Sequence, residues 1–136
     1  INYSTENLKD RINELTGGKG ADVVYDPVGG PYTEPAIRAL AWRGRLLVIG
    51  FAAGEIPKIP LNLALLKERS IVGVYWGDST RHDPAGHLAN LKQLNAWFAA
   101  GTIKPVVSER FSLDRAKDAI ALIANCGVKG KIVVVP

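Results

Sequence analysis

The sequence contains no methionine. Because translation starts with methionine, this absence predicts that Ile1 is not the natural start and that the 136 residues are a fragment of a longer protein, whether natural, engineered or proteolytic. Cysteine is almost as scarce, since Cys126 is the single one. A lone cysteine excludes a disulfide within the chain and favours a reducing compartment, so we expect a cytoplasmic protein.

Long apolar runs and dense runs of one charge are also missing. The apolar stretches are short and interrupted by charged residues, so no membrane span is expected. The formal charge is only +4, and the lysines and arginines are scattered rather than interleaved with aromatic residues. This distribution argues against nucleic-acid binding. With 47% hydrophobic and 22% charged residues, the composition is that of a soluble globular domain.

The common catalytic and phosphate-binding motifs are absent as well. The sequence has no P-loop, no G-x-S-x-G and no H-E-x-x-H, and the dinucleotide fingerprint G-x-G-x-x-G does not occur. The two histidines, His82 and His87, are spaced so that they do not stack on one helix face, and no cysteine is near them. We therefore predict no metal site and no catalytic residue in this chain.

What the sequence does contain is an alternation of extended and helical segments. Strands are predicted at 22–26, 45–50 and 70–76, and the last two are apolar on both faces, as in a parallel sheet covered by helices. A helix is predicted at 34–42, and the polar segment 77–84 is predicted as a loop. The order of these elements indicates a right-handed parallel α/β unit.

Towards its end the chain changes character. An extended segment at 106–111, a helix from Ser112 and a closing strand at 132–135 follow one another without the long apolar strands seen earlier. We therefore predict two domains, one at 1–102 and the other at 103–136.

Four segments, in this order along the chain, carry a resemblance to a known family. They are Ile1-Asn2-Tyr3, Gly20 to Gly30 (GADVVYDPVGG), Gly44 to Gly50 (GRLLVIG) and Gly130 to Val134 (GKIVV). Each segment alone is weakly specific. Together they resemble the medium-chain dehydrogenase/reductase family (the zinc-type alcohol dehydrogenase superfamily), in its quinone oxidoreductase-like branch, and the resemblance covers essentially the whole chain.

The resemblance implies the fold class α/β, with a partial Rossmann domain followed by a C-terminal α+β segment. Residues 1–102 would be the later part of an NAD(P)-binding Rossmann domain, a doubly wound parallel sheet whose first strands are missing. Residues 103–136 would be the return of the chain to a GroES-like catalytic domain. The glycine fingerprint, the residue that reads the ribose 2′ position and any zinc segment would precede Ile1, so we expect the fragment alone to be inactive.

The resemblance also implies where a nicotinamide cofactor would lie. Ligands of open α/β sheets bind at the carboxyl ends of the strands, and glycines there let the backbone approach a flat ring. Tyr3 would lie near the adenosine ribose or its phosphate, and Gly30 near the nicotinamide ribose. The residues implied to bind NADP or NAD are Tyr3, Gly30, Gly50, Phe51, Val72, Gly73 and Val74.

Several residues also have a simpler, structural interpretation. Gly29-Gly30 by itself fits a strand-to-helix turn as well as a cofactor loop, and only the resemblance favours the cofactor. Tyr3 could be a frayed surface residue. Asp26, at the end of a strand, is interpreted as a cap of the following loop rather than as a general base. Cys126 is interpreted as a packed or half-exposed thiol, because no basic cluster is evident to activate it.

The function implied by the resemblance is NAD(P)H-dependent reduction of a quinone or an α,β-unsaturated carbonyl, a small-molecule substrate, by hydride transfer. An enoyl-thioester reductase, a non-catalytic nucleotide-binding module and another doubly wound domain, such as a methyltransferase-like one, stay open as alternatives. By resemblance, strand 71–76 is a sheet edge where two subunits pair, so we expect a homodimer. With the first strands missing, the strand at 23–26 would become an open edge, which we expect to be covered by another chain, by crystal contacts or by rearranged segments.

Overall fold

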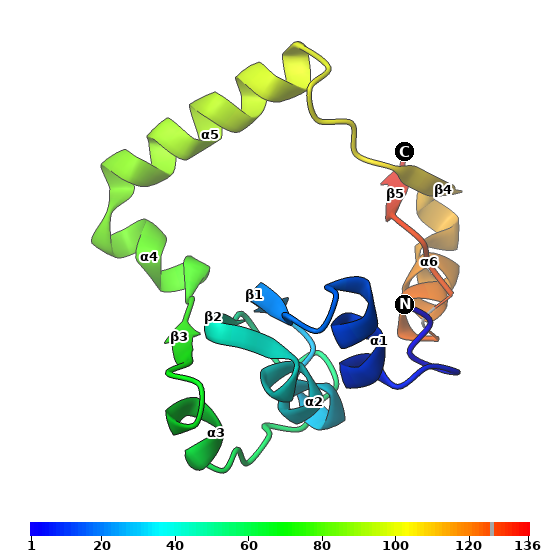
Figure 1. Cartoon of the computed structure of the whole chain (residues 1–136). Coiled ribbons are helices and arrows are strands. Elements are labelled where there is room, and N and C mark those ends of the chain that lie inside the picture. The colour runs from blue at the N-terminus through cyan, green and yellow to red at the C-terminus, as the bar shows by residue number, and fades with distance from the viewer. Residues whose placement is uncertain (126) are drawn as a thin grey trace. The chain divides into compact units, whose positions relative to one another are not determined.

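The computed structural model describes residues 1–125 and 127–136, so Cys126 and the prediction made for it lie outside the described residues. By its internal contacts the chain divides into two units, Ile1–Ser79 and Thr80–Pro136. Figure 1 labels the helices and strands of both units.

The first unit is a parallel sheet with short helices. Its elements are α1 (Leu8–Leu15), β1 (Ala21–Asp26), a 3-10 turn (Gly30–Tyr32), α2 (Thr33–Arg38), β2 (Leu40–Val48), α3 (Asn62–Leu65) and β3 (Ser70–Gly73). Among the described residues, the strands of this unit pair in the order β1-β2-β3, and both pairings are parallel. The predicted parallel α/β arrangement is therefore confirmed.

Both outer strands of this sheet carry exposed apolar side chains. Within the described part of the chain β1 pairs only with β2, and the Tyr25 and Val23 side chains of β1 are 66% and 43% exposed. The edge at 23–26 is therefore open among the described residues, and its covering by another chain stays a prediction. On the opposite edge, Ile71 and Val72 of β3 are also exposed.

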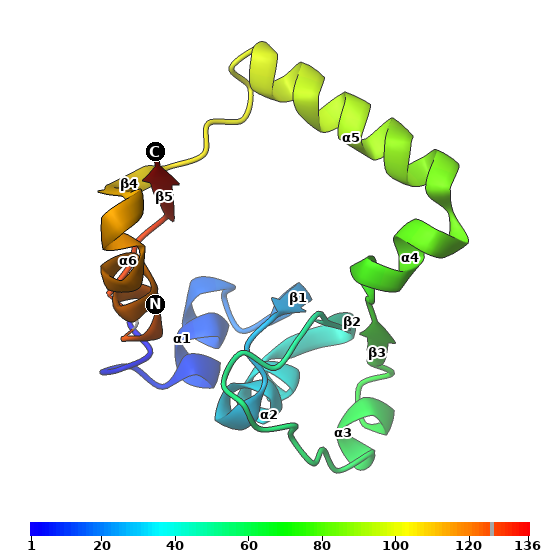
Figure 2. The ribbon, with the colours of Figure 1, turned by 180° about the vertical axis from the view of Figure 1, so that it is seen from behind.

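The hydrophobic core of the first unit lies between α2 and the sheet. Figures 1 and 2 show α2 against β1 and β2 from two opposite sides. The core is formed by Ile37 of α2, Leu40 and Leu46 of β2, and Leu63 of α3, each at most 4% exposed. A buried side chain of this size contributes about 1.5–3 kcal/mol to stability. This packing fixes the loops that leave the carboxyl ends of β1 and β2.

The helix predicted at 34–42 is shorter than expected, because α2 ends at Arg38 and β2 already begins at Leu40. Residue pairing with β1 shifts from Ala21↔Leu40 to Val23↔Arg45, so β2 is bulged over the residues between. The bulge needs a left-handed backbone, which Arg43 adopts with a φ of 57°. The residues expected to continue the helix therefore form the start of a strand.

A buried arginine explains where α2 stops. The guanidinium of Arg69 donates from Nη2 to the carbonyl oxygens of Arg38 and Leu40 at 3.1 and 2.8 Å, and from Nη1 to that of Leu63 at 3.1 Å. Two of these carbonyls bracket the junction between α2 and β2. Burial lowers the pKa of Arg69 from its ordinary value, and the charge of Arg38 lowers it further. Arg69 thus connects α2, β2 and α3 through one side chain.

Two further segments after β2 differ from expectation. The strand predicted at 70–76 ends at Gly73. The polar segment 77–84, predicted as a loop, is mostly helical, because α4 covers Trp76–His82. The Ser79 hydroxyl donates to the carbonyl oxygen of Trp76 at 2.7 Å, which gives this short helix a local side-chain bond.

The second unit contains a long helix and a small parallel sheet (Figure 1). Its elements are α5 (Pro84–Ala99), β4 (Val107–Ser112), a 3-10 turn (Leu113–Arg115), α6 (Ala116–Ala124) and β5 (Lys131–Val135). Asp83 caps α5 by accepting a bond from the Gly86 amide at 2.9 Å. In the described part of this unit β4 and β5 pair in parallel. The predicted boundary between 102 and 103 concerns membership of a larger catalytic domain and stays a prediction.

Candidate functional site

The carboxyl ends of β1, β2 and β3 lie at the same edge of the sheet, because the strands are parallel. Asp26 pairs with Val48, and Val48 pairs with Gly73, so the last residues of the three strands are in register. The backbone amide of Val74 donates to the carbonyl oxygen of Val48 at 2.9 Å, which continues this alignment past the end of β3. An open α/β sheet binds its ligands at this edge.

The loop after β1 is organised by the Asp26 carboxylate, which is 9% exposed. Its Oδ1 accepts bonds from the backbone amides of Val28 and Gly29 at 3.0 and 2.9 Å, and its Oδ2 accepts a bond from the Thr33 hydroxyl at 2.7 Å. Because both oxygens are engaged in local bonds, the interpretation of Asp26 as a loop cap is confirmed. Thr33 was missed by the sequence analysis.

The loops after β1 and β2 are hydrogen-bonded to each other. The Ala52 and Ala53 amides donate to the carbonyl oxygens of Pro27 and Val28 at 3.1 and 2.9 Å. Two residues further along each segment, the Gly30 amide donates to the carbonyl oxygen of Glu55 at 3.1 Å. The two segments that carry Gly30, Gly50 and Phe51 therefore form one continuous backbone structure.

Phe51 lies directly against Gly29. A Cβ on Gly29 would be 2.8 Å from Cδ1 of Phe51, which is closer than real Cβ atoms approach. Gly29 also has a φ of 69° and a ψ of −148°, a conformation that is essentially restricted to glycine. Glycine is thus required here for two reasons, and its neighbour Phe51 remains 39% exposed at the edge of the sheet.

The end of β3 adds further apolar surface at this edge. The side chains of Val72 and Val74 are 39% and 38% exposed. Around Gly73 no atom lies within 4 Å of the place where a Cβ would be, so the space beside this residue is open. Half-exposed apolar side chains next to an open glycine are the features that a flat ring requires for close approach.

The structure also places Tyr3 near the loop after β1, but through another residue. The Tyr3 ring packs edge to face on the Tyr32 ring, with centroids 5.5 Å apart. Tyr32 closes the 3-10 turn that begins at Gly30. The Tyr3 side chain is 64% exposed and hence accessible to a ligand. Gly50 lies two residues after the end of β2, and a Cβ there would meet only the Pro27 carbonyl oxygen at 3.4 Å.

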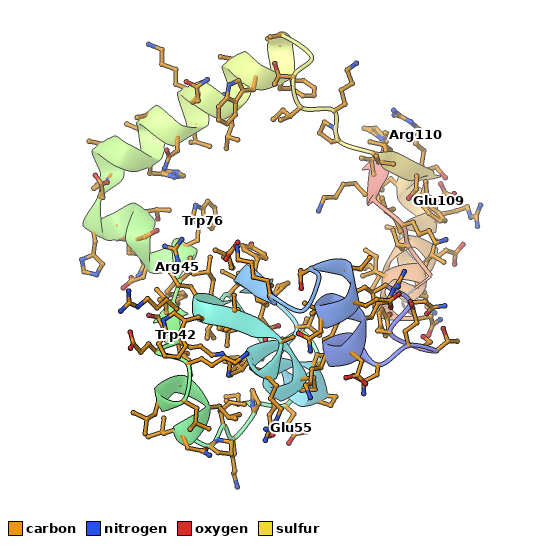
Figure 3. All side chains as sticks on the ribbon, in the orientation of Figure 1. Trp42, Arg45, Glu55, Trp76, Glu109 and Arg110 are labelled. Atoms are coloured by element: carbon orange, nitrogen blue, oxygen red, sulfur yellow. The ribbon has the colours of Figure 1, made fainter. Side chains whose placement is uncertain are left out.

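A hollow of about 550 Å³ lies beside Gly30, between α2 and the loop after β2. It is lined by Gly30, Pro31, Glu34, Pro35, Arg38, Glu55, Pro57, Lys58 and Ile59. Arg38 and Glu34 form an ion pair across one turn of α2, with Nη2 and Oε1 2.6 Å apart. Figure 3 shows the Glu55 side chain beside α2. The sequence analysis found only Gly30 of this set, because the others share no motif.

No metal centre or membrane helix is found in the described part of the chain. Within it, no group of three or more His, Cys, Asp and Glu side chains is arranged to hold a metal ion. None of its helices combines the length and apolar character needed to cross a membrane.

Comparison with known proteins supports the resemblance seen in the sequence. The model of the family described as zinc-binding dehydrogenase matches residues 1–134. The quinone oxidoreductase-like protein 2 homolog of Nematostella vectensis is 39% identical over 98% of this chain and 37% of its own length. The quinone oxidoreductase of Salmonella typhimurium is 30% identical over 100% of this chain and 42% of its own length. The chain thus spans about two fifths of the length of these relatives.

A solved structure gives the same result. The Escherichia coli quinone oxidoreductase, determined in complex with NADPH, is 28% identical and superimposes with a TM-score of 0.82 over 100% of this chain and 42% of its own length. The fold is therefore a Rossmann-like α/β fold, as predicted. Since the family model covers nearly the whole sequence, the chain belongs to the zinc-binding dehydrogenase family, and its resemblance to the C-terminal part of quinone oxidoreductase-like members is confirmed.

Proposed function

We propose that this chain forms the nicotinamide side of the cofactor site in an NADPH-dependent oxidoreductase that reduces a quinone or an α,β-unsaturated carbonyl. The observation that carries the proposal is the joined edge of the sheet, where the Gly29–Gly30 loop is bonded to the loop that starts at Phe51. The Escherichia coli relative in complex with NADPH favours this form of the cofactor over NADH. The quinone substrate follows the names of these relatives, and the α,β-unsaturated carbonyl follows the family resemblance of the sequence.

The residues at this edge fit one half of a dinucleotide. Phe51, Val72 and Val74 offer half-exposed apolar surface, and Gly73 leaves open space for a flat ring. Backbone groups near Gly30 and Gly50 suit the polar ribose and carboxamide, because no charged side chain is needed for such neutral groups. The pyrophosphate half has no counterpart, since the sequence has no G-x-G-x-x-G.

In this proposal the chain binds and orients the cofactor and supplies no catalytic residue. The nicotinamide itself supplies the hydride when it is bound. Phe51 and the two valines hold one face of the ring and exclude water from it, which orients the opposite face towards the substrate. Tyr3, through its contact with Tyr32, borders the path expected for the adenosine ribose or its phosphate.

The test is a pair of titrations on the full-length protein, followed by an assay of quinone reduction. NADPH should quench or shift tryptophan fluorescence at lower concentration than NADH, and turnover of a simple quinone should follow. Failure of the wild-type protein to bind either nucleotide would contradict the proposal and favour a module without redox chemistry. Binding of NADPH without turnover of a quinone would instead favour an enoyl thioester as the substrate.

Substitution of Gly73 by valine tests the placement of the ring. Because nothing lies within 4 Å of a Cβ at this position and its φ is not left-handed, the variant should keep the stability of the wild type. The new side chain fills the open space, so we expect NADPH binding to weaken on the order of tenfold. Ser70→Val, in the same strand, is the matched control and should leave the affinity for NADPH unchanged. Equal binding by Gly73→Val would place the ring elsewhere.

We further propose that two copies of the full-length protein pair through residues 71–76. β3 is an outer strand of its sheet in the described part of the chain, and its residues Ile71 and Val72 are exposed. Tyr75 and Trp76, which follow the end of β3, are exposed as well. An apolar strand edge of this kind favours association, because its unpaired backbone groups and its side chains can both be satisfied by a second copy.

The cytoplasmic location also stays a prediction.

A further inference from the structure

The hydrogen bond between Thr33 and Asp26 is the best-buried polar contact near the candidate site. The exposed fractions of the two residues are 4% and 9%. The bond from Thr33 Oγ1 to Asp26 Oδ2 is 2.7 Å long, and it joins the end of β1 to the start of α2. Among the described residues no ion pair includes Asp26, so its carboxylate is held in place by the Thr33 hydroxyl and the Val28 and Gly29 amides.

Gly29 connects the buried Asp26 carboxylate to the exposed Phe51 side chain. The Gly29 amide is held by Asp26 Oδ1 at 2.9 Å, and the Gly29 Cα faces the Phe51 ring so closely that a Cβ would collide with it. The next amide, that of Gly30, is bonded to the loop that carries Phe51. A movement of the Asp26 carboxylate therefore displaces both glycines and, through them, Phe51.

We infer that Asp26 and Thr33 are positioning residues for cofactor binding: the Thr33 hydroxyl orients Asp26, Asp26 holds Gly29, and Gly29 sets the place of Phe51. Neither side chain touches the cofactor. This inference rests on the proposed function, in which Phe51 contacts the nicotinamide. Loss of the hydroxyl removes one of three bonds to the carboxylate, so the loop and Phe51 shift and the ring binds less tightly.

The decisive variant is Thr33→Val in the full-length protein, because valine keeps the shape of threonine and removes only the hydroxyl. We expect the KM for NADPH to rise on the order of tenfold, as follows from the loss of a charge-assisted bond, while the KM for the quinone stays within about twofold. Thr33→Ser restores the hydroxyl and should bring the KM for NADPH back to near the wild-type value.

Thr16→Val is the matched control for purely structural effects. The Thr16 hydroxyl donates to the Ile12 carbonyl oxygen at 2.8 Å and accepts from the Gly20 amide at 2.9 Å, far along the chain from the Phe51 loop. Its loss should lower Tm by an amount similar to that for Thr33→Val, without changing the KM for NADPH. If both variants lower Tm but only Thr33→Val raises the KM for NADPH, Thr33 acts as a positioning residue for the cofactor.

The inference is overturned if Thr33→Val lowers Tm but binds NADPH as tightly as the wild type, or if Thr33→Ser fails to restore binding. Should Thr33→Val not fold, Thr33→Ala serves instead, because alanine also lacks the hydroxyl and is well tolerated in a helix. The same rise in the KM for NADPH is expected, and an unchanged value refutes the inference. A wild-type protein that binds no nicotinamide nucleotide contradicts the proposed function itself, which separates the two failures.

Discussion

Gly20 enters β1 with a φ of 88°, and a Cβ on it would lie 2.5 Å from the Ala39 carbonyl oxygen and 2.8 Å from the Ala41 amide nitrogen. Both neighbours are backbone atoms at the junction of α2 and β2 and cannot yield without moving the sheet. We therefore expect Gly20→Ala to lower the free energy of unfolding by about 3 kcal/mol. Urea unfolding monitored by circular dichroism measures the change.

Gly54→Ala is the control for backbone strain alone. Gly54 has a similar φ of 86°, but nothing lies within 4 Å of its missing Cβ. The substitution should therefore lower the free energy of unfolding by only about 1 kcal/mol. Equal losses for the two variants would mean that the left-handed conformation, and not the contact with Ala39 and Ala41, requires glycine at position 20.

Single residues also show where sequence reasoning succeeds. Asp26 ends a strand and precedes Pro27 and two glycines, and this local pattern was enough to predict a carboxylate that caps its own loop. Thr33 has no such pattern. Its bond to Asp26 forms because the turn at Gly30–Tyr32 brings the start of α2 back to the end of β1, and only the folded backbone determines that distance.

Elements are connected at one point by the buried guanidinium of Arg69, which bonds the last carbonyl of α2, the first carbonyl of β2 and a carbonyl of α3. Arg69→Met removes all three bonds and leaves these oxygens without their donors. Since unsatisfied buried groups cost more than the desolvation of the arginine recovers, we expect a loss of about 2 kcal/mol in the free energy of unfolding. Thermal and urea unfolding both report it.

Arg38→Met is the matched control, because Arg38 is exposed and, among the described residues, its side chain forms an ion pair with Glu34 on the same helix. An exposed pair of this spacing contributes below about 0.5 kcal/mol. If Arg69→Met is as stable as the wild type, the burial of the charge, which also lowers the pKa of Arg69, outweighs its three bonds.

The boundary between α2 and β2 shows why element ends are hard to predict. The residues Ala39, Leu40, Ala41 and Trp42 continue the apolar pattern of a helix, so the sequence favoured a helix up to Trp42. In the structure the helix does not continue past Arg38. Arg69, far along the chain, donates hydrogen bonds to the carbonyl oxygens of Arg38 and Leu40 on either side of this end. A contact at long sequence separation overrides a local propensity.

At the scale of the whole molecule, the expected homodimer can be tested directly by sedimentation. Ile71→Lys places a charge on the outer strand β3, where Ile71 is 42% exposed. A buried ammonium at a dimer interface is costly, so the full-length variant should sediment as a monomer where the wild type sediments as a dimer.

Ile120→Lys, an exposed position of α6, carries the same substitution outside β3 and should leave the sedimentation of the protein unchanged. A monomeric wild type would refute pairing through residues 71–76. A dimeric Ile71→Lys variant would place the interface elsewhere.

The sequence by itself determined the parallel α/β fold, the family and the glycine-rich loop after β1, because these depend on local apolar runs, turn residues and their order. Tertiary structure alone decided how those parts meet. Three contacts join residues from different elements: Gly29 with Phe51, Asp26 with Thr33, and Arg69 with the backbone of Arg38. These contacts form because folding brings the residues close together in space, and no local sequence pattern encodes that distance.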